Sequence, residues 1–225
     1  MARAADPMSV AGAIYYTYFF AIPNGALLPD ATAVHETADA VERAERSGDE
    51  IALHTARCAQ GITLAHRDSP QREAGFALLA QVRDAAVQQR FALQIVPVVD
   101  IQLAEQKAGS GDLDGAIALA RAVLEDLFDS GGAIWSAPAT TVLVEALLRR
   151  GTDGDLQDAQ AEIDRLAAVP TDPGFVLHEI WLLRLRALLA QARGDAGYRD
   201  YRDRYRKLAT ERGFEGHIAM AEAMT

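Results

Sequence analysis

Aromatic and cationic side chains alternate regularly near the end of the sequence. Three tyrosines recur at i, i+3 and i+7, and an arginine directly follows each one, which gives the set Tyr198, Arg199, Tyr201, Arg202, Tyr205 and Arg206. On a helix this spacing places the tyrosines on one face and the arginines beside it. Such a pattern is most often a core-facing tyrosine row with solvated arginines. The functional alternative is a face that binds a peptide or an anion, because arginine binds carboxylate or phosphate through two nitrogens and both residue types favour interface hot spots.

The histidines and the single cysteine form no recognisable catalytic or metal-binding motif. The five histidines are scattered, at His35, His54, His66, His178 and His217. Only His54 has a partner at the i, i+4 spacing of a shared helix face, namely Cys58, whereas a zinc site needs three or four converging ligands. Cys58 lies in an apolar helical stretch, which indicates a small buried hydrophobe and not a nucleophile. One cysteine allows no intrachain disulfide and fits a reducing compartment.

Other catalytic signatures are also missing from the sequence. It contains neither a Gly-x-Ser-x-Gly elbow nor a Gly-x-x-x-x-Gly-Lys-[Ser/Thr] phosphate loop. Acidic pairs such as Glu42/Glu45 and Glu125/Asp126 are typical of solvated helix faces. A carboxylate pair assembled from remote positions by packed helices stays open as an alternative. We therefore predict no catalytic residue, no metal and no cofactor, and a protein that is not an enzyme.

The charge of the chain is negative and unevenly distributed. Its 225 residues carry a net charge of −10, which argues against nucleic-acid binding because phosphate contacts need a basic surface. Residues 178–212 nevertheless hold nine Lys+Arg and five Asp+Glu, a local charge of +4 on a remainder of −14. This basic segment is either an interaction surface or a solvated helix face.

Turn signals separate a series of segments with helical spacing, and the sequence predicts an all-α fold. Asp112 is the expected N-cap of the helix that follows it, and Ser69 the expected N-cap of a helix with Pro70 at its first position. Helices are expected at about 8–21, 31–46, 50–66, 70–89, 97–108, 113–127, 138–150, 156–168, 175–193 and 196–212, with a last short helix after Gly213.

Every second helix opens at a regular interval along the chain. The openings are Asp30-Ala31, Ser69-Pro70, Gly111-Asp112, Gly154-Asp155 and Gly194-Asp195, separated by about 39, 42, 43 and 40 residues. A period of this size indicates stacked helical hairpins, each of which buries its apolar face only against its neighbours. We predict one helical-repeat domain over residues 1–225, an α-solenoid of about five antiparallel hairpins with residues 213–225 as its C-terminal cap.

The apolar run Ser9–Ile22 is expected to form the first helix of this array. It is too short to span a bilayer and lacks the cleavage site of a signal peptide, so the cytoplasm is the expected location. Its aromatic residues occupy more than one helix face, and one face has no earlier repeat to cover it. We therefore expect self-association into a homo-oligomer through residues 8–22, with Tyr16, Phe19 and Phe20 as the candidate face.

Two stretches carry resemblances to known families. Gly111-Asp112-Leu113-Asp114-Gly115-Ala116-Ile117 and its echo at residues 154–159 resemble the inter-helix turn of tetratricopeptide repeats, in a longer variety than the usual 34-residue unit. Residues 181–190, Gly194-Asp195, residues 198–205 and Gly213-Phe214-Glu215-Gly216-His217 resemble the C-terminal end of bacterial signalling proteins that join an adenylate/guanylate cyclase domain to a switch ATPase and a helical-repeat region.

The second resemblance covers most of residues 8–225 and only the repeat region of such proteins. It implies a role in sensing, autoinhibition or scaffolding, and no functional residue is carried over from it. The leading hypothesis is a non-catalytic regulatory module that binds a protein or peptide partner, without nucleic acid or membrane. The competing hypothesis is an all-α small-molecule-binding protein or enzyme fragment that uses a cavity between hairpins.

Overall fold

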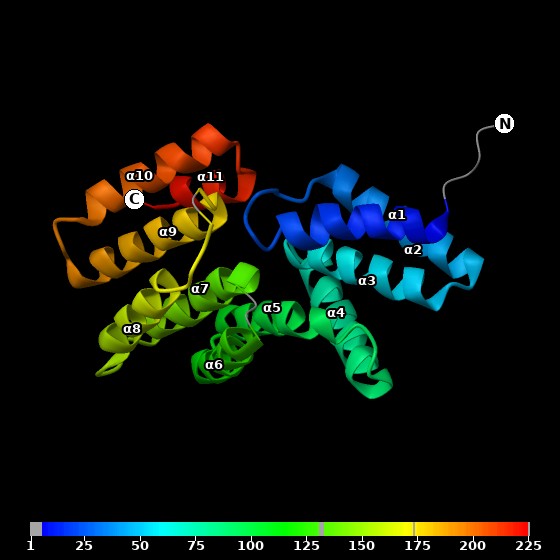
Figure 1. Cartoon of the computed structure of the whole chain (residues 1–225), viewed down its shortest axis with the longest axis horizontal. Helices are drawn as coiled ribbons and strands as arrows, with labels where there is room; N and C mark the ends of the chain where they lie inside the picture. Colours follow the sequence, from blue (N-terminus) through cyan, green and yellow to red (C-terminus); the bar gives the residue numbers. More distant parts are fainter. Residues whose placement is uncertain (1–5, 131–132, 173, 225) are drawn as a thin grey trace. The chain divides into compact units, whose positions relative to one another are not determined.

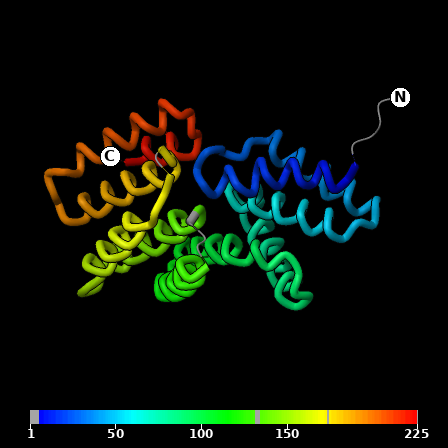
Figure 2. The backbone as a smooth tube through the Cα atoms, in the orientation of Figure 1, coloured from blue at the N-terminus to red at the C-terminus, as the bar shows by residue number. Residues whose placement is uncertain are grey.

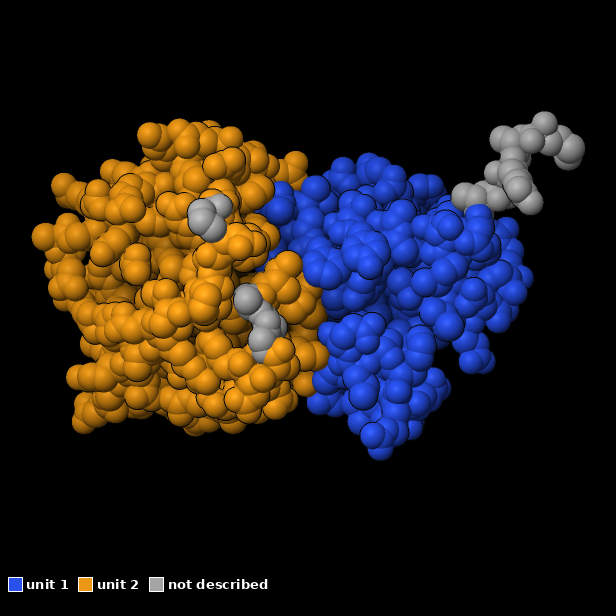
Figure 3. All heavy atoms as spheres, viewed as in Figure 1, with its two compact units in different colours: residues 1–96 blue, residues 97–225 orange. Residues whose placement is uncertain are grey.

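The computed structural model describes residues 6–130, 133–172 and 174–224, and this part of the chain is helical with no strand. The all-α prediction is therefore confirmed. The chain divides into two compact units, residues 1–96 and residues 97–225, which Figure 3 colours separately. The expectation of one repeat domain over residues 1–225 stays a prediction.

The first unit is built around one central helix, α3. Its elements in chain order are α1 (Pro7–Ile14), the π-helical turn η1 (Tyr15–Phe19), α2 (Ala31–Ser47), α3 (Glu50–Ala65), α4 (Gln71–Gln89) and the short 3₁₀ turn η2 (Leu93–Ile95) (Figure 1). Helix α3 packs against α1, η1, α2 and α4. Because it has neighbours on several sides, many of its apolar residues are buried, and Cys58 and Ile62 are fully buried.

Local capping explains where most helices of this unit begin. Asp30 accepts a hydrogen bond from the backbone N–H of Ala33 at 2.8 Å, and Asp49 accepts two from the first turn of α3. The expected N-cap at Ser69 is wrong. Its hydroxyl donates to the Glu73 carboxylate at 3.0 Å instead, and the helix begins after Pro70 without a side-chain cap.

Helices α3 and α4 approach closely enough that only glycine fits at their contact. A Cβ atom built on Gly75 of α4 would lie 2.3 Å from the backbone nitrogen of Ala65, at the end of α3. A Cβ on Gly61 would lie 2.8 Å from a methyl carbon of Leu79. Small residues on both helices therefore set the tight packing of this hairpin.

The second unit is a succession of helices joined by short turns (Figure 2). Its elements are α5 (Val96–Gly109, which starts at the last residue of the first unit), α6 (Leu113–Ser130), α7 (Ala133–Arg150), α8 (Asp155–Ala167), α9 (Val176–Arg193), α10 (Tyr198–Arg212) and α11 (Glu215–Glu222). From α6 to α11 each helix packs against the next, and α7 also packs against α9.

The starts of two helices in this unit can be compared with the starts predicted from the sequence. Asp112 is the N-cap of α6, as predicted, because its carboxylate accepts from the N–H of Gly115 at 3.0 Å. Helix α7 starts at Ala133, five residues before the predicted start at Pro138, and contains that proline. Trp135 and Ala137 are buried there, so tertiary packing holds a helical turn that the proline alone would not indicate. The sequence Ser130-Gly131-Gly132 is a stop signal for the preceding helix, and its two glycines lie outside the described residues.

Ion pairs join neighbouring helices of this unit over long separations in sequence. Arg121 of α6 binds Asp158 of α8 at 2.5 Å across 37 residues, and Arg150 binds Asp114 at 2.7 Å across 36. Arg184 of α9 pairs with Glu145 of α7. Residues about one sequence period apart therefore lie next to each other.

Candidate functional site: a pocket between α6, α7 and α8

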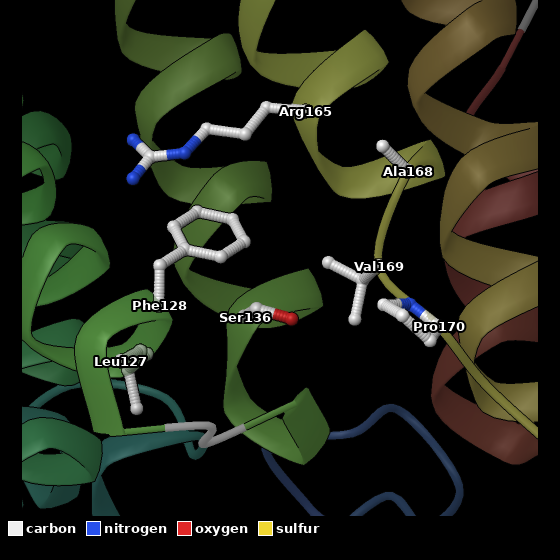
Figure 4. Close-up of a pocket in the computed structure, with 7 residues that line it drawn as sticks. All are labelled: Leu127, Phe128, Ser136, Arg165, Ala168, Val169 and Pro170. Carbon is white, nitrogen blue, oxygen red and sulfur yellow. The ribbon is translucent and has the colours of Figure 1, made fainter.

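An apolar pocket of about 420 Å³ opens in the second unit where α6 and α8 end and α7 begins (Figure 4). Its walls come from three helices and from the segment that follows α8. The lining residues are Leu127, Phe128, Ser136, Arg165, Ala168, Val169 and Pro170. A concave, mostly apolar surface with a few polar groups is the usual form of a ligand or peptide-anchor site.

The inner lining residues of the pocket are buried, and its rim is exposed to solvent. Leu127 and Ser136 are buried, at 4% and 1% exposure, in α6 and in the early turns of α7. Phe128 and Val169 are half-buried, and Ala168, directly after α8, is exposed. The pocket therefore has a buried floor and an exposed rim, at which Ala168 and Pro170 are accessible to solvent.

Arg165 covers one side of the pocket and is held there by two partners (Figure 4). Its guanidinium carbon lies 3.9 Å from the centre of the Phe128 ring, a cation–π contact. Its two terminal nitrogens bind the Glu125 carboxylate at 2.5 and 3.3 Å. The guanidinium is thus oriented from both its face and its edge, and its charge is compensated by Glu125.

Acidic groups outnumber this guanidinium at the rim. Glu125, Glu162 and Asp129 all act electrostatically on Arg165 and raise the pKa of its guanidinium. Burial raises the pKa of Glu162, and the neighbouring carboxylates add to the effect while Arg165 and Arg121 oppose it. One oxygen of Glu162 is buried without a hydrogen-bond partner. The rim therefore favours cations and disfavours anions.

The predicted tyrosine–arginine face lies on α10, and its residues differ in how deeply they are buried. Tyr205 is fully buried, and its hydroxyl lies 2.9 Å from Nδ1 of His217 on α11. Its place on an exposed interaction face is therefore a wrong prediction, because the hydroxyl is used inside the core. Tyr198 and Tyr201 are half-buried. The core-facing interpretation describes this stripe better than the binding-face interpretation.

The arginines of that stripe differ in how they are engaged. Arg202 lies over the Tyr198 ring and binds Asp203 at 2.9 Å, while Arg206 donates to the backbone carbonyl of Ala221 at 3.3 Å. Arg199 is exposed. Arg202 is thus engaged within α10, and Arg206 connects α10 to α11.

A buried polar cluster surrounds Tyr205. Burial raises the pKa of its hydroxyl, which stays protonated. The Trp181 and His217 rings meet edge to face at 4.4 Å between centroids, and the Arg184 guanidinium lies near the same indole. This cluster joins α9, α10 and α11 and acts in folding.

The residues of the predicted N-terminal aromatic face also differ in their burial. Tyr16 is 71% exposed and stacks on the half-buried Phe20 ring at 5.7 Å between centroids. Phe19 is 1% exposed and stacks on Tyr15 at 4.4 Å, inside the first unit. The inclusion of Phe19 in an exposed self-association face is therefore wrong, whereas Tyr16 and Phe20 remain a candidate pair.

The remaining candidate groups lie apart. Cys58 is fully buried, and burial raises the pKa of its thiol to about 12, which makes it unreactive, as its apolar surroundings predict. Within the described ranges no three His, Cys, Asp or Glu side chains are placed to hold a metal ion. Among the helices that the structure describes, none has both the length and the apolar character needed to cross a bilayer.

The sequence offers a cavity between hairpins only as an alternative, and the position of this pocket could not be predicted because its residues are separated by up to about one repeat period. The acidic pair Glu125/Asp126 in α6 is typical of a solvated face, and the local apolar signal is the pair Leu127-Phe128 next to it. Comparisons with protein-family models, with curated proteins and with solved structures find no match for this chain.

Proposed function

We propose that this protein is a non-catalytic helical-repeat module of the tetratricopeptide-like kind, which binds a protein or peptide partner. The observation that carries the proposal is the apolar pocket between α6, α7 and α8. Helical-repeat proteins bind partners on surfaces formed by successive hairpins, and this pocket uses three successive helices. A regulatory or scaffolding role in the cytoplasm, as in the cyclase–ATPase proteins that the sequence resembles, belongs to the same proposal.

The spacing of the helices supports the repeat interpretation. Helices α2, α4, α6, α8 and α10 begin at residues 31, 71, 113, 155 and 198, close to the five openings expected from the sequence. Three inter-helix ion pairs of the second unit join residues 36, 37 and 40 positions apart, which is close to that interval. Equivalent positions of adjacent hairpins in a stacked array would meet at this separation.

The composition of the pocket favours binding over catalysis. Of its lining residues, five are apolar, one is the Arg165 side chain paired with Glu125, and one is Ser136. Apolar burial is therefore the main interaction that this surface offers a ligand.

A pair of tryptophan variants tests the proposal. Peptides selected on the wild-type chain from a random display library should lose binding to Ala168→Trp, whose indole fills the pocket from its rim. They should retain binding to Ala167→Trp, which adds the same side chain at an adjacent exposed position outside the lining. Peptides that bind both variants equally would contradict a binding role for this pocket.

A small-molecule-binding protein is the second candidate. The pocket volume of about 420 Å³ lies within the range of small-molecule sites, roughly 300–1,000 Å³. A thermal-shift screen of small apolar compounds distinguishes the two functions. Compounds that raise the melting temperature of wild type and Ala167→Trp, but not that of Ala168→Trp, would favour the small-molecule role.

A further inference from the structure

We propose that the partner is a basic protein segment that places an apolar side chain in the pocket and lysine or arginine side chains along the α6–α8 surface. This inference rests on the proposed function, because it names the chemistry of the segment that the pocket binds. It is carried by the charges around the pocket together with the apolar lining.

The part of the chain that builds the pocket is strongly acidic. Residues 97–177 hold 14 Asp+Glu and five Lys+Arg, a charge of 5 − 14 = −9 in a chain whose total is −10. Helices α6 and α8 together contribute eight acidic and two basic residues. Most of the negative charge of the protein is therefore concentrated in the region that contains the pocket.

Both basic residues of α6 and α8 are already paired within this surface. Arg121 binds Asp158 at 2.5 Å, and Arg165 binds Glu125 at 2.5 Å. Arg150 of α7 also binds Asp114 and Asp155. The acidic residues of α6 and α8 outside these ion pairs include the exposed Asp126, Asp129 and Asp164.

The rim of the pocket has the same sign as the wider surface. One guanidinium, that of Arg165, lies among three carboxylates, those of Glu125, Glu162 and Asp129. A carboxylate or phosphate ligand would have to displace Glu125 and approach the other two acidic groups. A cationic side chain instead gains attraction from all of these groups, and a negative surface also speeds its approach.

The apolar lining decides which basic ligand fits best. A free cation has no apolar group to bury in walls made by Leu127, Phe128 and Val169. A protein segment with helical spacing presents apolar anchors and cationic side chains together, which is the helix-in-groove mode of recognition. Burial of one large apolar side chain in the pocket strengthens binding, and the surrounding charges determine which segments bind.

The test uses the full chain and two synthetic peptides of about 14 residues, long enough for four helical turns. One contains lysine and leucine in amphipathic helical spacing, and the other has glutamate in place of every lysine. Binding is measured by fluorescence anisotropy of a label on the peptide. We expect the lysine peptide to bind and the glutamate peptide not to bind, with affinity falling about tenfold or more between about 0.05 and 0.5 M salt.

Matched variants separate the pocket from general charge attraction. Ala168→Trp should weaken binding of the lysine peptide by about tenfold or more, the loss of one buried anchor, and Ala167→Trp should leave it unchanged. The double variant Glu162→Gln, Asp129→Asn should weaken binding, and Glu42→Gln, Asp84→Asn, which removes the same charges from exposed positions of the first unit, should not. Circular dichroism checks that each variant is folded.

The outcomes distinguish failure of this inference from failure of the proposed function. Equal binding of the glutamate and lysine peptides, both lost in Ala168→Trp, would overturn the basic partner and keep the pocket as a binding site. Binding of the lysine peptide that is insensitive to Ala168→Trp would overturn the inference as well, because charge alone would then explain it. Absence of any peptide binding sensitive to Ala168→Trp would overturn both.

Discussion

Arg165 and Glu125 form a two-point ion pair across 40 residues of sequence, from α8 to α6, with nitrogen–oxygen distances of 2.5 and 3.3 Å. The pair lies beside the pocket and also orients the guanidinium over Phe128. Because both side chains are partly exposed, its contribution to stability is small. Its importance lies in positioning, since it connects two helices one sequence period apart at the edge of the candidate site.

The most deeply embedded carboxylate of the second unit predicts a pH-dependent stability. The Asp155 side chain is 3% exposed, and it accepts from Nε and Nη2 of Arg150 and from the amide and hydroxyl of Thr152. Hydrogen bonds from Arg150 hold its pKa well below the ordinary value of 3.8. Asp155→Asn should lower the free energy of unfolding at neutral pH by about 2–3 kcal/mol, less than for a fully buried pair because Arg150 is partly exposed.

The sign of this effect follows from the lowered pKa. Stabilisation by the ionised carboxylate is present above pH 3.8 and is lost as the pH falls through the folded-state pKa. Urea denaturation at about pH 7 and pH 3 should therefore show a difference between wild type and Asp155→Asn that shrinks in acid. Asp153→Asn, at an exposed position of the same turn, serves as the control. An equal difference at both pH values would contradict the assignment.

Glu162 should have the opposite effect on the pH dependence of the unfolding free energy. Burial raises its folded-state pKa above the ordinary value of 4.5, so ionisation costs stability as the pH rises through the folded-state pKa. Glu162→Gln should raise the unfolding free energy at neutral pH by about 0.5 kcal/mol, as for a partly exposed site, and the gain should vanish below the unfolded pKa. Thermal melts over this pH range provide the measurement. A variant less stable than wild type at neutral pH would contradict this prediction, because it would show that the Glu162 carboxylate makes a stabilising interaction in the folded protein.

The helices could be predicted because their signals are local. Asp30, Asp49 and Asp112 cap helices through hydrogen bonds to residues two or three positions ahead, and the apolar spacing of each segment matches its buried face. The incorrect boundaries have non-local causes. Burial of Trp135 extends α7 to residues before Pro138. The Ser69 hydroxyl donates a hydrogen bond to the Glu73 carboxylate and does not cap the helix.

The candidate site could not be predicted because its parts meet only in three dimensions. Phe128 and Arg165 lie in different helices, and nothing in their local sequence pairs them. Periodicity correctly placed the tyrosines of α10 on one helix face, but it does not say whether that face is covered. Packing of α11 covers Tyr205 and supplies His217 as its partner, which turns a candidate interface residue into a core residue.

The close approach of α3 and α4 predicts an asymmetry between two glycine substitutions. Gly75→Ala should lower the free energy of unfolding by about 3 kcal/mol, because the new methyl group would overlap backbone atoms of Leu64 and Ala65. Gly12→Ala in α1 meets nothing within 4 Å and should raise stability by about 0.5–1 kcal/mol through helix propensity. Chemical denaturation of both variants checks this. Similar effects of the two substitutions would show that the hairpin contact is looser than described.

The buried hydroxyl of Tyr205 predicts a difference within the tyrosine stripe. Tyr205→Phe should destabilise the protein by about 1–3 kcal/mol, because a buried nitrogen of His217 loses its hydrogen-bond partner. Tyr201→Phe removes a hydroxyl from a half-buried ring and should change stability little. Equilibrium unfolding in urea, followed by circular dichroism, compares the two variants. Equal effects would mean that the Tyr205–His217 bond contributes nothing in solution.

The exposed Tyr16 and the half-buried Phe20 keep the self-association hypothesis testable. Tyr16 is 71% exposed, and its ring stacks on that of Phe20, so the two form one accessible apolar surface on η1 and the residue after it. We expect wild type to form a homo-oligomer at high concentration, and Tyr16→Glu with Phe20→Glu to shift it towards monomer while the circular dichroism spectrum stays helical.

Phe19→Glu provides the contrast for this prediction. The Phe19 side chain is 1% exposed, so the substitution places an unpaired charge in the core of the first unit and should unfold it. Sedimentation velocity over a range of protein concentrations, with circular dichroism on the same samples, measures both effects. A wild-type chain that stays monomeric at the highest concentration would contradict self-association. Loss of helical signal in the double variant would instead place Tyr16 and Phe20 in the core, because only a buried pair needs apolar side chains for folding.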